Sequence, residues 1–317
     1  MIKIVVLSAV DEPDLPGLEA LAESASIDYA RDEARLRDAL LSHDILVVTD
    51  FRDDLLRRCW PENPSIRWVH ATSAGVDALM FPALVESDIT VTNARGIFDQ
   101  GIAEYVLGAI LAFAKDTFGN IYYRQKSQWK HRETALIKGK KALIVGTGSI
   151  GSCTGRLLAA VGIEVNGIAR SEKKQQGFNA VYPGTQLLEC LAEADYVVIA
   201  APLTSQTRHL FDERAFAAMK PTAFLINVGR GPIVKTPALL EALEAEKISG
   251  AALDVFEEEP LPTDHPLWQY DNVMISAHMA GDFIGWRRAL GEQFVENFRH
   301  WQNAQPLFNQ VKKQMIE

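Results

Sequence analysis

Three polar side chains, Arg230, Glu259 and His278, each lie shortly after an apolar run that is typical of a buried strand. A histidine beside a carboxylate can carry a proton near neutral pH, because the negative charge favours the imidazolium form. An arginine offers a planar fork that can hold a carboxylate and a carbonyl oxygen. Together with a nicotinamide hydride donor, these are the groups that the reduction of a 2-keto acid needs.

Each of the three residues also has a structural explanation when it is taken alone. Arg230 is compatible with an exposed turn, and Glu259 with the solvated acidic run Glu257–Glu259. His278 is compatible with a buried, hydrogen-bonded position in a core. We interpret the set as catalytic because the carboxyl ends of parallel strands share one edge of a sheet, where α/β proteins bind their ligands.

A nucleotide site is indicated by the run Gly146-Thr147-Gly148-Ser149-Ile150-Gly151, which follows the apolar run Ala142–Val145 and precedes a helical pattern. In such a strand–turn–helix the first glycine allows a tight turn and the second lets the backbone approach a pyrophosphate. The third lets helix and strand pack closely, and the N–H groups at the helix start face the phosphates. Flavin and S-adenosylmethionine proteins carry similar runs, so the flanking strand and helix support the interpretation.

The end of the next strand indicates which nicotinamide cofactor is preferred. A site for the unphosphorylated cofactor places a carboxylate there, about 20 residues after the glycines. In this chain the strand Val165–Ala169 ends in Arg170 and Ser171, which can bind a 2′-phosphate by charge-assisted hydrogen bonds. We therefore predict NADP(H) as the preferred cofactor, with NAD(H) as the alternative. An exposed Arg170 without a ligand, or an inward-turned Glu172, would weaken this prediction.

The elements that position these residues alternate along the chain between short apolar strands and helical patterns. This alternation predicts an α/β protein with parallel sheets covered by helices. One long helix is predicted from about Gly101 to Gln125, and another from about Trp286 to Trp301. The first series of predicted strands is Ile2–Leu7, Ile27–Tyr29, Ile45–Val48, Trp68–His70 and Ile89–Thr92, and a helix is predicted between them at Glu33–Leu41. The second series has about six strands. These strands are Ala142–Val145, Val165–Ala169, Tyr196–Ala200, Ala223–Val228, Ala251–Val255 and Val273–Ser276.

Composition narrows the class of protein. The 317 residues suffice for about two domains, and 48% are hydrophobic and 23% charged, as in ordinary globular proteins. A formal net charge of −9 argues against bulk attraction to nucleic acid or anionic membranes. No apolar run approaches the roughly 18 residues of a membrane span, and the N-terminal one is too short for a signal peptide. Cys59, Cys153 and Cys190 form no metal-ligand cluster, so we expect reduced thiols, no metal and a cytoplasmic location.

Several motifs, in order along nearly the whole chain, resemble those of the D-isomer-specific 2-hydroxyacid dehydrogenases. The motifs are Ser73–Asp77, Gly101–Glu104, Gly146–Gly151, Ala201–Thr204 with Thr207, Asn227–Gly231, Asp254–Phe256 with Glu259-Pro260, and His278–Gly281. The resemblance implies two doubly wound parallel-sheet domains, a flavodoxin-like substrate domain and a Rossmann cofactor domain. It also implies that the substrate domain is discontinuous, with residues 1–97 and 286–317, and that residues 98–285 bind NAD(P).

The resemblance implies a role for each matching position. Arg230 would hold the substrate carboxylate and carbonyl, His278 would be the general acid in reduction, and Glu259 would keep His278 protonated. Backbone N–H groups near Ala74 and Gly75 would receive the substrate carboxylate. Together with Arg170 and Ser171, the implied cofactor positions are Gly146, Gly148, Ser149, Ile150, Gly151, Pro202, Thr207, Val228, Gly281 and Asp254, the last on the nicotinamide carboxamide.

The resemblance further implies a homodimer formed through residues 101–138. In some glyoxylate and hydroxypyruvate reductases of this family, a tryptophan of this arm reaches the partner's active site. Trp129 is placed to do this, or to pack in the dimer interface instead. Residues 282–286 depart from the family's threonine-rich pattern, so we expect Trp286 to reshape the substrate pocket.

The leading expectation is an NADPH-dependent reductase of a small anionic 2-keto acid such as glyoxylate, hydroxypyruvate or pyruvate. The sequence has no extra basic cluster near Ala74 and Gly75 that could bind a phosphate on the substrate. We therefore expect an unphosphorylated keto acid. Two other classes fit the same fold. One is a nucleotide-sensing corepressor that binds protein partners, and the other is a dehydrogenase of formate or phosphite.

Overall fold

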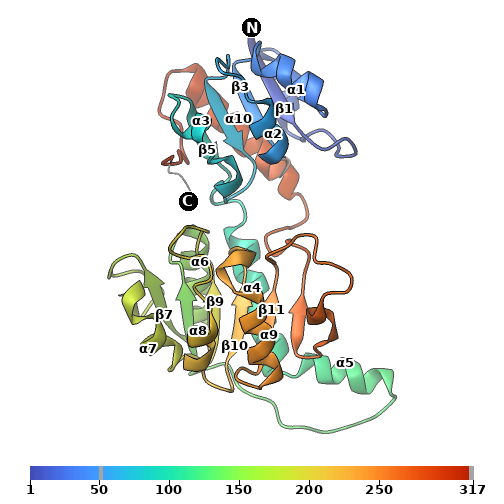
Figure 1. The fold of residues 1–317 in the computed structure, drawn as a ribbon, viewed down its shortest axis with the longest axis vertical. Helices are drawn as coiled ribbons and strands as arrows, with labels where there is room; N and C mark the ends of the chain where they lie inside the picture. The colour runs from blue at the N-terminus through green and yellow to red at the C-terminus, as the bar shows by residue number, and fades with distance from the viewer. Residues whose placement is uncertain (50–52, 314–317) are drawn as a thin grey trace. The chain divides into compact units, whose positions relative to one another are not determined.

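The computed structural model describes residues 1–49 and 53–313, and the chain divides into two compact units. One unit combines Met1–Phe98 with the C-terminal segment that begins at Phe283, and the other is Asp99–Asp282. Each unit contains a parallel sheet with helices packed on it (Figure 1). The predicted fold class, α/β with two parallel-sheet domains, is therefore confirmed.

The sheet of the first unit has the strand order β2-β1-β3-β4-β5 and is parallel throughout. This is the predicted flavodoxin-like order. Strands that are buried on both faces read as continuous apolar runs, and every residue of β3 and β4 is buried. The strands are β1 (Ile2–Leu7), β2 (Ala25–Ala30), β3 (Ile45–Val48), β4 (Trp68–Ala71) and β5 (Thr90–Asn93).

The C-terminal helix α10 (Trp286–Gln302) belongs to the first unit and packs on its sheet. Its buried face carries Leu290, Phe294 and Phe298, which share a core cluster with Trp68 of β4. The rings of Trp68 and Phe294 stack with centroids 5.1 Å apart. The other helices of this unit are η1 (Leu18–Leu21), α1 (Glu33–Leu40), α2 (Asp53–Cys59), η2 (Asp77–Leu79) and α3 (Pro82–Val85).

The sheet of the second unit has the order β12-β11-β10-β9-β6-β7-β8 and is also parallel. The chain winds in one direction from β6 to β8 and in the other from β9 to β12. The winding therefore reverses between β6 and β9, the switch point at which Rossmann folds bind dinucleotides. The strands are β6 (Lys141–Val145), β7 (Glu164–Ala169), β8 (Ala180–Pro183), β9 (Tyr196–Ile199), β10 (Phe224–Asn227), β11 (Gly250–Leu253) and β12 (Val273–Ile275).

Two expectations for this unit need correction. We expected about six strands, whereas the sheet has seven, because β8 was missed. This strand, Ala180-Val181-Tyr182-Pro183, is only four residues long, buries only Val181 and ends in a proline, which is unusual in a strand. The long helix expected from Gly101 to Gln125 is two helices, α4 (Asp99–Ala114) and α5 (Thr117–Gln125).

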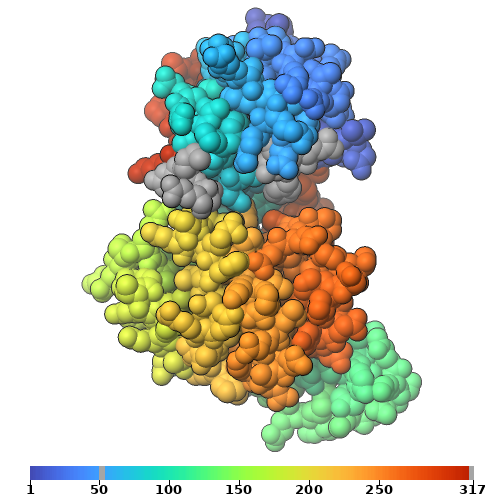
Figure 2. Space-filling view, in the orientation of Figure 1, coloured from blue at the N-terminus to red at the C-terminus, as the bar shows by residue number. Residues whose placement is uncertain are grey.

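Asp116 causes the break between α4 and α5. Its φ of 48° is left-handed, a conformation that ends a helix. Its side chain caps the next helix, because Oδ1 accepts a hydrogen bond of 3.1 Å from the N–H of Gly119. Figure 2 shows α5 and the residues after it, in green, as a protrusion of the second unit. The remaining helices are α6 (Ser149–Ala160), η3 (Gly184–Gln186), α7 (Leu187–Leu191), α8 (Glu213–Ala218), η4 (Gly231–Ile233), α9 (Thr236–Glu244) and η5 (Pro266–Gln269).

Candidate active site

The glycine-rich turn lies between β6 and α6 and fits a pyrophosphate. Gly146 has a φ of +98°, and a Cβ there would lie 2.5 Å from the backbone nitrogen of Ala201. A Cβ on Gly151 would collide with the carbonyl oxygen of Gly146, so helix and turn pack too closely for a side chain. A Cβ on Gly148 would meet nothing within 4 Å, which leaves this face of the turn open to a ligand. The tight turn predicted at Gly146 and the close packing predicted at Gly151 are thus seen, whereas the approach of a pyrophosphate at Gly148 stays a prediction.

The helix α6 begins at Ser149, and the N–H groups at the start of such a helix favour the binding of an anion. The hydroxyl of Ser149 donates to the carboxylate of Asp99 at the start of α4. A contact between Ser149 and a cofactor would therefore use the backbone N–H. Ile150 continues the first turn of the helix.

The segment after β7 folds back onto the glycine-rich turn. Arg170 and Ser171 are exposed immediately after this strand. The ammonium group of Lys173 donates to the carbonyl oxygen of Thr147 at 3.3 Å, and Gln175 Nε2 donates to the same oxygen at 3.2 Å. Lys173 thereby brings a cation to the turn, a contact that the sequence pattern did not single out.

The other predicted cofactor residues of this unit lie in loops at the carboxyl edge of the sheet. After β9, Thr207 Oγ1 donates to the carbonyl of Pro202 at 2.7 Å and accepts from the N–H of Thr204 at 2.8 Å, which closes this loop. Val228 follows β10 and is buried. Gly281 lies against the start of α4, since a Cβ on Gly101 would be 2.7 Å from its carbonyl oxygen.

The three predicted catalytic residues follow neighbouring strands. Arg230 comes after β10, Glu259 after β11 and His278 after β12, and these strands lie side by side in the sheet. His278 Nδ1 lies 2.8 Å from Glu259 Oε2. The other carboxylate oxygen, Oε1, accepts a bond of 2.9 Å from the N–H of Phe256. The structure therefore brings the histidine and its predicted carboxylate partner together.

The electrostatic surroundings of Glu259 favour its ionised form. Burial pushes the pKa of this carboxyl upward, but the hydrogen bonds from His278 and Phe256 and the positive charge of Arg230 outweigh burial and lower its pKa below the ordinary value of 4.5. The positive charge of Arg230 therefore stabilises the ionised form of the same carboxylate that contacts His278. Arg230 also donates from Nη1 to the carbonyl of Gly229 at 2.8 Å.

Asp254 holds the loop that carries His278. This residue is only 3% exposed, and its Oδ1 accepts bonds from Ser276 Oγ at 2.6 Å and from the N–H of Met279 at 2.9 Å. Its Oδ2 accepts the N–H of Ala280 at 3.0 Å. These bonds support the left-handed φ of 52° at His278, an unusual conformation for a residue with a side chain. A contact of Asp254 with a nicotinamide carboxamide stays a prediction.

The predicted substrate residues Ala74, Gly75 and Trp286 belong to the first unit. Asn93 Nδ2 donates to the carbonyl of Ala74, and Ser73 Oγ to that of Gly75, both at 2.6 Å. Both carbonyl oxygens thus accept a hydrogen bond from a side chain of the protein. The ring of Trp286 packs near that of Phe98, with centroids 6.1 Å apart, so this tryptophan has a packing role, and its contact with substrate stays a prediction.

Trp129, the other predicted substrate residue, is fully exposed in the arm after α5. Within residues 1–49 and 53–313, no group of three or more His, Cys, Asp or Glu side chains is arranged to hold a metal ion. No helix in the same ranges is long and apolar enough to cross a membrane.

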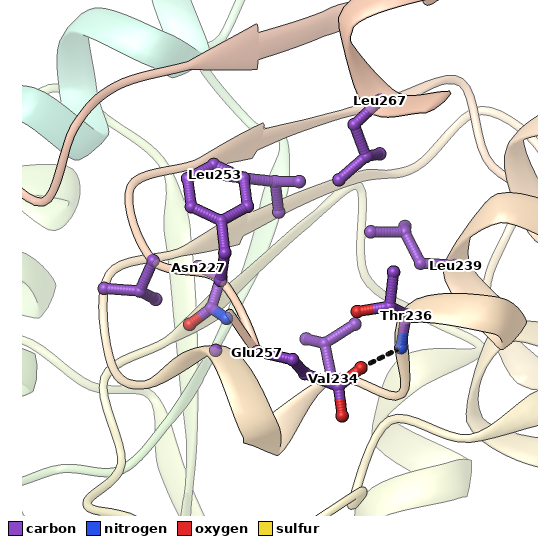
Figure 3. Close-up of a pocket in the computed structure, with 10 residues that line it drawn as sticks. Asn227, Val234, Thr236, Leu239, Leu253, Glu257 and Leu267 are labelled. Atoms are coloured by element: carbon purple, nitrogen blue, oxygen red, sulfur yellow. Dashed lines mark hydrogen bonds between the residues drawn. The ribbon is translucent and has the colours of Figure 1, made fainter. Parts of the chain in front are cut away.

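A small cavity lies against the Arg230 loop, the segment 228–235 between β10 and α9 (Figure 3). Asn227, Leu253, Glu257 and Leu267 are among the residues that line it. Its volume of about 10 Å³ is the size of one water molecule. The cavity is therefore too small for a keto acid or a nucleotide.

Comparison with known proteins agrees with this geometry. Residues 107–280 match the model of the NAD-binding domain of the D-isomer-specific 2-hydroxyacid dehydrogenases. Over 313 residues the chain is 32% identical to a glyoxylate reductase of Thermofilum pendens, an alignment that covers 93% of this chain and 90% of that protein.

Two solved structures are also similar. A D-isomer-specific 2-hydroxyacid dehydrogenase from Xanthobacter autotrophicus Py2, in complex with NADPH and MES, is 29% identical and matches 97% of each chain with a TM-score of 0.83. An NADPH-dependent glyoxylate/hydroxypyruvate reductase from Sinorhizobium meliloti, in complex with NADP and sulfate, is 26% identical and matches 99% of each chain with a TM-score of 0.85.

Proposed function

Because the chain belongs to the family of D-isomer-specific 2-hydroxyacid dehydrogenases, we propose that it reduces a small 2-keto acid with NADPH as the preferred cofactor. As a member of this family the chain is an oxidoreductase that uses a nicotinamide cofactor. The observation that carries the proposal is the His278–Glu259 pair, held at 2.8 Å and within the electrostatic influence of Arg230.

In the proposed reaction, the guanidinium of Arg230 holds the carboxylate and the carbonyl oxygen of the keto acid. Its positive charge stabilises the negative charge that develops on this oxygen. His278 donates a proton to the same oxygen, and Glu259 both orients the imidazole and stabilises its positive form before the transfer. The nicotinamide, when bound, supplies the hydride. A carboxylate contact with the turn at Ala74–Gly75 stays a prediction.

The preference for NADPH is supported by the cations beside the glycine-rich turn. Arg170 and Ser171 replace the carboxylate that would hold an unphosphorylated ribose, and Lys173 contacts Thr147 in the turn itself. A 2′-phosphate would be bound by such groups through charge-assisted hydrogen bonds. The solved relatives that were crystallised with NADPH or NADP are consistent with this proposal.

The proposed substrates are glyoxylate and hydroxypyruvate, with pyruvate as a further candidate. The names of the relatives from Thermofilum pendens and Sinorhizobium meliloti favour the first two acids. In the proposed direction the enzyme consumes NADPH and forms a 2-hydroxy acid. A cytoplasmic location stays a prediction.

We also propose a homodimer that forms through residues 101–138. The arm after α5 protrudes from the second unit (Figure 2). It exposes Trp129 fully and Leu136 to 73%, a large apolar area for a single chain to leave in water. Trp129 would pack in the interface or reach the partner's active site. Light scattering would report the dimer, and Trp129→Ala would weaken it in both cases but would raise the KM for the keto acid only in the second.

Initial rates with glyoxylate, hydroxypyruvate and pyruvate, each with NADPH and with NADH, test the proposed function. We expect reduction of at least one acid, with a higher kcat/KM for NADPH than for NADH. Oxidation of formate or phosphite without keto acid reduction would instead favour the one-carbon or inorganic substrates. Nucleotide binding without turnover of any of these compounds would favour a corepressor-like binding protein.

A further inference from the structure

The second unit contains another histidine–glutamate pair, which the proposed reaction does not use. Of the three glutamates in the loop after β11, Glu259 contacts His278, and Glu257 contacts His209. His209 lies in the segment between β9 and α8, and its Nε2 is 2.8 Å from Glu257 Oε1. The same short loop thus holds two histidines that come from different parts of the chain.

Glu257 also contacts the far end of the Arg230 loop. Its Oε2 accepts a hydrogen bond of 2.8 Å from the N–H of Thr236, drawn as a dashed line in Figure 3. Thr236 is the first residue of α9, so the carboxylate lies at the positive end of a nine-residue helix. One carboxylate therefore links His209, the loop after β11 and the segment in which the Arg230 loop ends.

The Arg230 loop is fixed between these two neighbours. On one side, the N–H of His209 donates to the carbonyl of Pro232 at 2.8 Å, and the N–H of Lys235 donates to that of Phe211 at 3.0 Å. On the other side, a Cβ on Gly231 would collide with the carbonyl group of Phe256, so the two loops are in direct backbone contact. Any movement of Glu257 would therefore be transmitted to the loop that carries Arg230.

The second part of the loop after β11, which carries Glu259, sets the position of His278. Glu259 accepts the N–H of Phe256 through Oε1 and contacts His278 through Oε2. Glu257 and Glu259 are two residues apart, so the loop after β11 contacts the Arg230 segment through one glutamate and His278 through the other. We propose that Glu257, paired with His209, is a positioning residue that fixes Arg230 relative to His278, an inference that rests on the proposed function.

The charge of Glu257 agrees with this role. Burial pushes the pKa of the carboxyl upward, but hydrogen bonds from Thr236 and His209 outweigh burial, so the pKa lies below the ordinary value of 4.5. At neutral pH the group is a carboxylate that accepts hydrogen bonds with both oxygens. A neutral or missing side chain would lose at least part of this link.

Steady-state kinetics of four variants test the proposal. Glu257→Ala removes both contacts, and Glu258→Ala makes the same truncation at the neighbouring position as a matched control. His209→Ala removes one contact, whereas His209→Gln keeps an N–H donor for Glu257. We expect Glu257→Ala to raise the KM for the keto acid about tenfold with a smaller change in kcat, because a displaced Arg230 binds the substrate poorly.

The expected pattern has two further parts. His209→Ala changes KM in the same direction, and His209→Gln restores it toward the wild-type value. The alkaline limit of activity stays where it is in the wild type, because the His278–Glu259 pair is intact. A KM within twofold of wild type in Glu257→Ala, an equal effect of Glu258→Ala, or a shifted alkaline limit would overturn the proposal.

Hydrogen–deuterium exchange separates this inference from the proposed function, because it requires no turnover. In Glu257→Ala we expect faster exchange at the amides of residues 231–236, and no such change in Glu258→Ala. Unchanged exchange in this segment would overturn the positioning role whether or not the enzyme reduces a keto acid. If the wild type reduced none of the acids while exchange rose as expected, the proposed function alone would fail.

Discussion

His278 Nδ1 lies 2.8 Å from Glu259 Oε2, and the two residues stand on loops that follow the neighbouring strands β12 and β11. The Nδ1 side of the imidazole therefore contacts the carboxylate. Asp254 holds the backbone of the loop that carries His278, because it accepts hydrogen bonds from the N–H groups of Met279 and Ala280. The histidine is thereby fixed both at its ring and at its backbone.

Glu259→Gln removes the negative charge while keeping the size of the side chain. We expect kcat/KM for the keto acid to fall by at least about tenfold, because the imidazole of His278 loses the charged partner that orients it. The measurement is kcat/KM for the keto acid as a function of pH. Glu258→Gln is the control, since it makes the same change one residue away, and an unchanged kcat/KM in Glu259→Gln would disprove the role of the pair.

Arg170→Asp should reverse the cofactor preference. An aspartate at the end of β7 repels a 2′-phosphate and can bind the free 2′-hydroxyl instead. We expect the ratio of kcat/KM for NADPH to that for NADH to fall by at least about tenfold, which corresponds to roughly 1.4 kcal/mol. Lys173→Met should lower the ratio less, through the loss of one cation near the turn. A wild-type ratio below one would contradict the predicted preference.

The fold follows largely from patterns that are local in the sequence. The apolar runs that become β1, β3 and β6 are continuous because parallel strands are buried on both faces, and such runs are visible without a structure. The break at Asp116 was not visible, because apolar spacing continues across it and a single left-handed residue with its cap decides the geometry. The sequence does not indicate β8, because this strand is only four residues long and ends in Pro183, which is unusual in a strand.

The candidate site, like the fold, could be predicted only in part from the sequence. Arg230, Glu259 and His278 could be named from the sequence because each follows an apolar strand at one edge of a sheet. The contacts of Lys173 with Thr147 and of Glu257 with His209 join residues 26 and 48 positions apart, and no periodic pattern reports such pairs. The acidic run containing Glu257 is equally compatible with a solvated loop, so only its hydrogen bonds reveal the difference.

His70 predicts how stability depends on pH. It is fully buried, its Nδ1 is 2.8 Å from Thr92 Oγ1, and burial lowers its pKa from 6.5 to about 3. Between these values the unfolded chain binds a proton that the folded chain does not. The free energy of unfolding should therefore fall as the pH falls below about 6.5, by about 2 kcal/mol from this residue at pH 5.

Urea denaturation at pH 7 and at pH 5, followed by tryptophan fluorescence, measures this contribution. His70→Asn keeps a polar atom near Thr92 but cannot bind the proton. We expect this variant to be less stable than the wild type at pH 7 and to lose less stability on acidification. Equal losses in the two proteins would show that His70 does not contribute to the pH dependence.

We propose His278 as the general acid of a nicotinamide-dependent keto acid reductase. The most direct measurement compares kcat for keto acid reduction by the wild type and by His278→Ala, with cofactor binding followed separately by fluorescence. We expect a loss of about 10²- to 10⁴-fold in kcat with nearly unchanged cofactor affinity. A His278→Ala enzyme that retains kcat within a few-fold of the wild type would contradict this proposal.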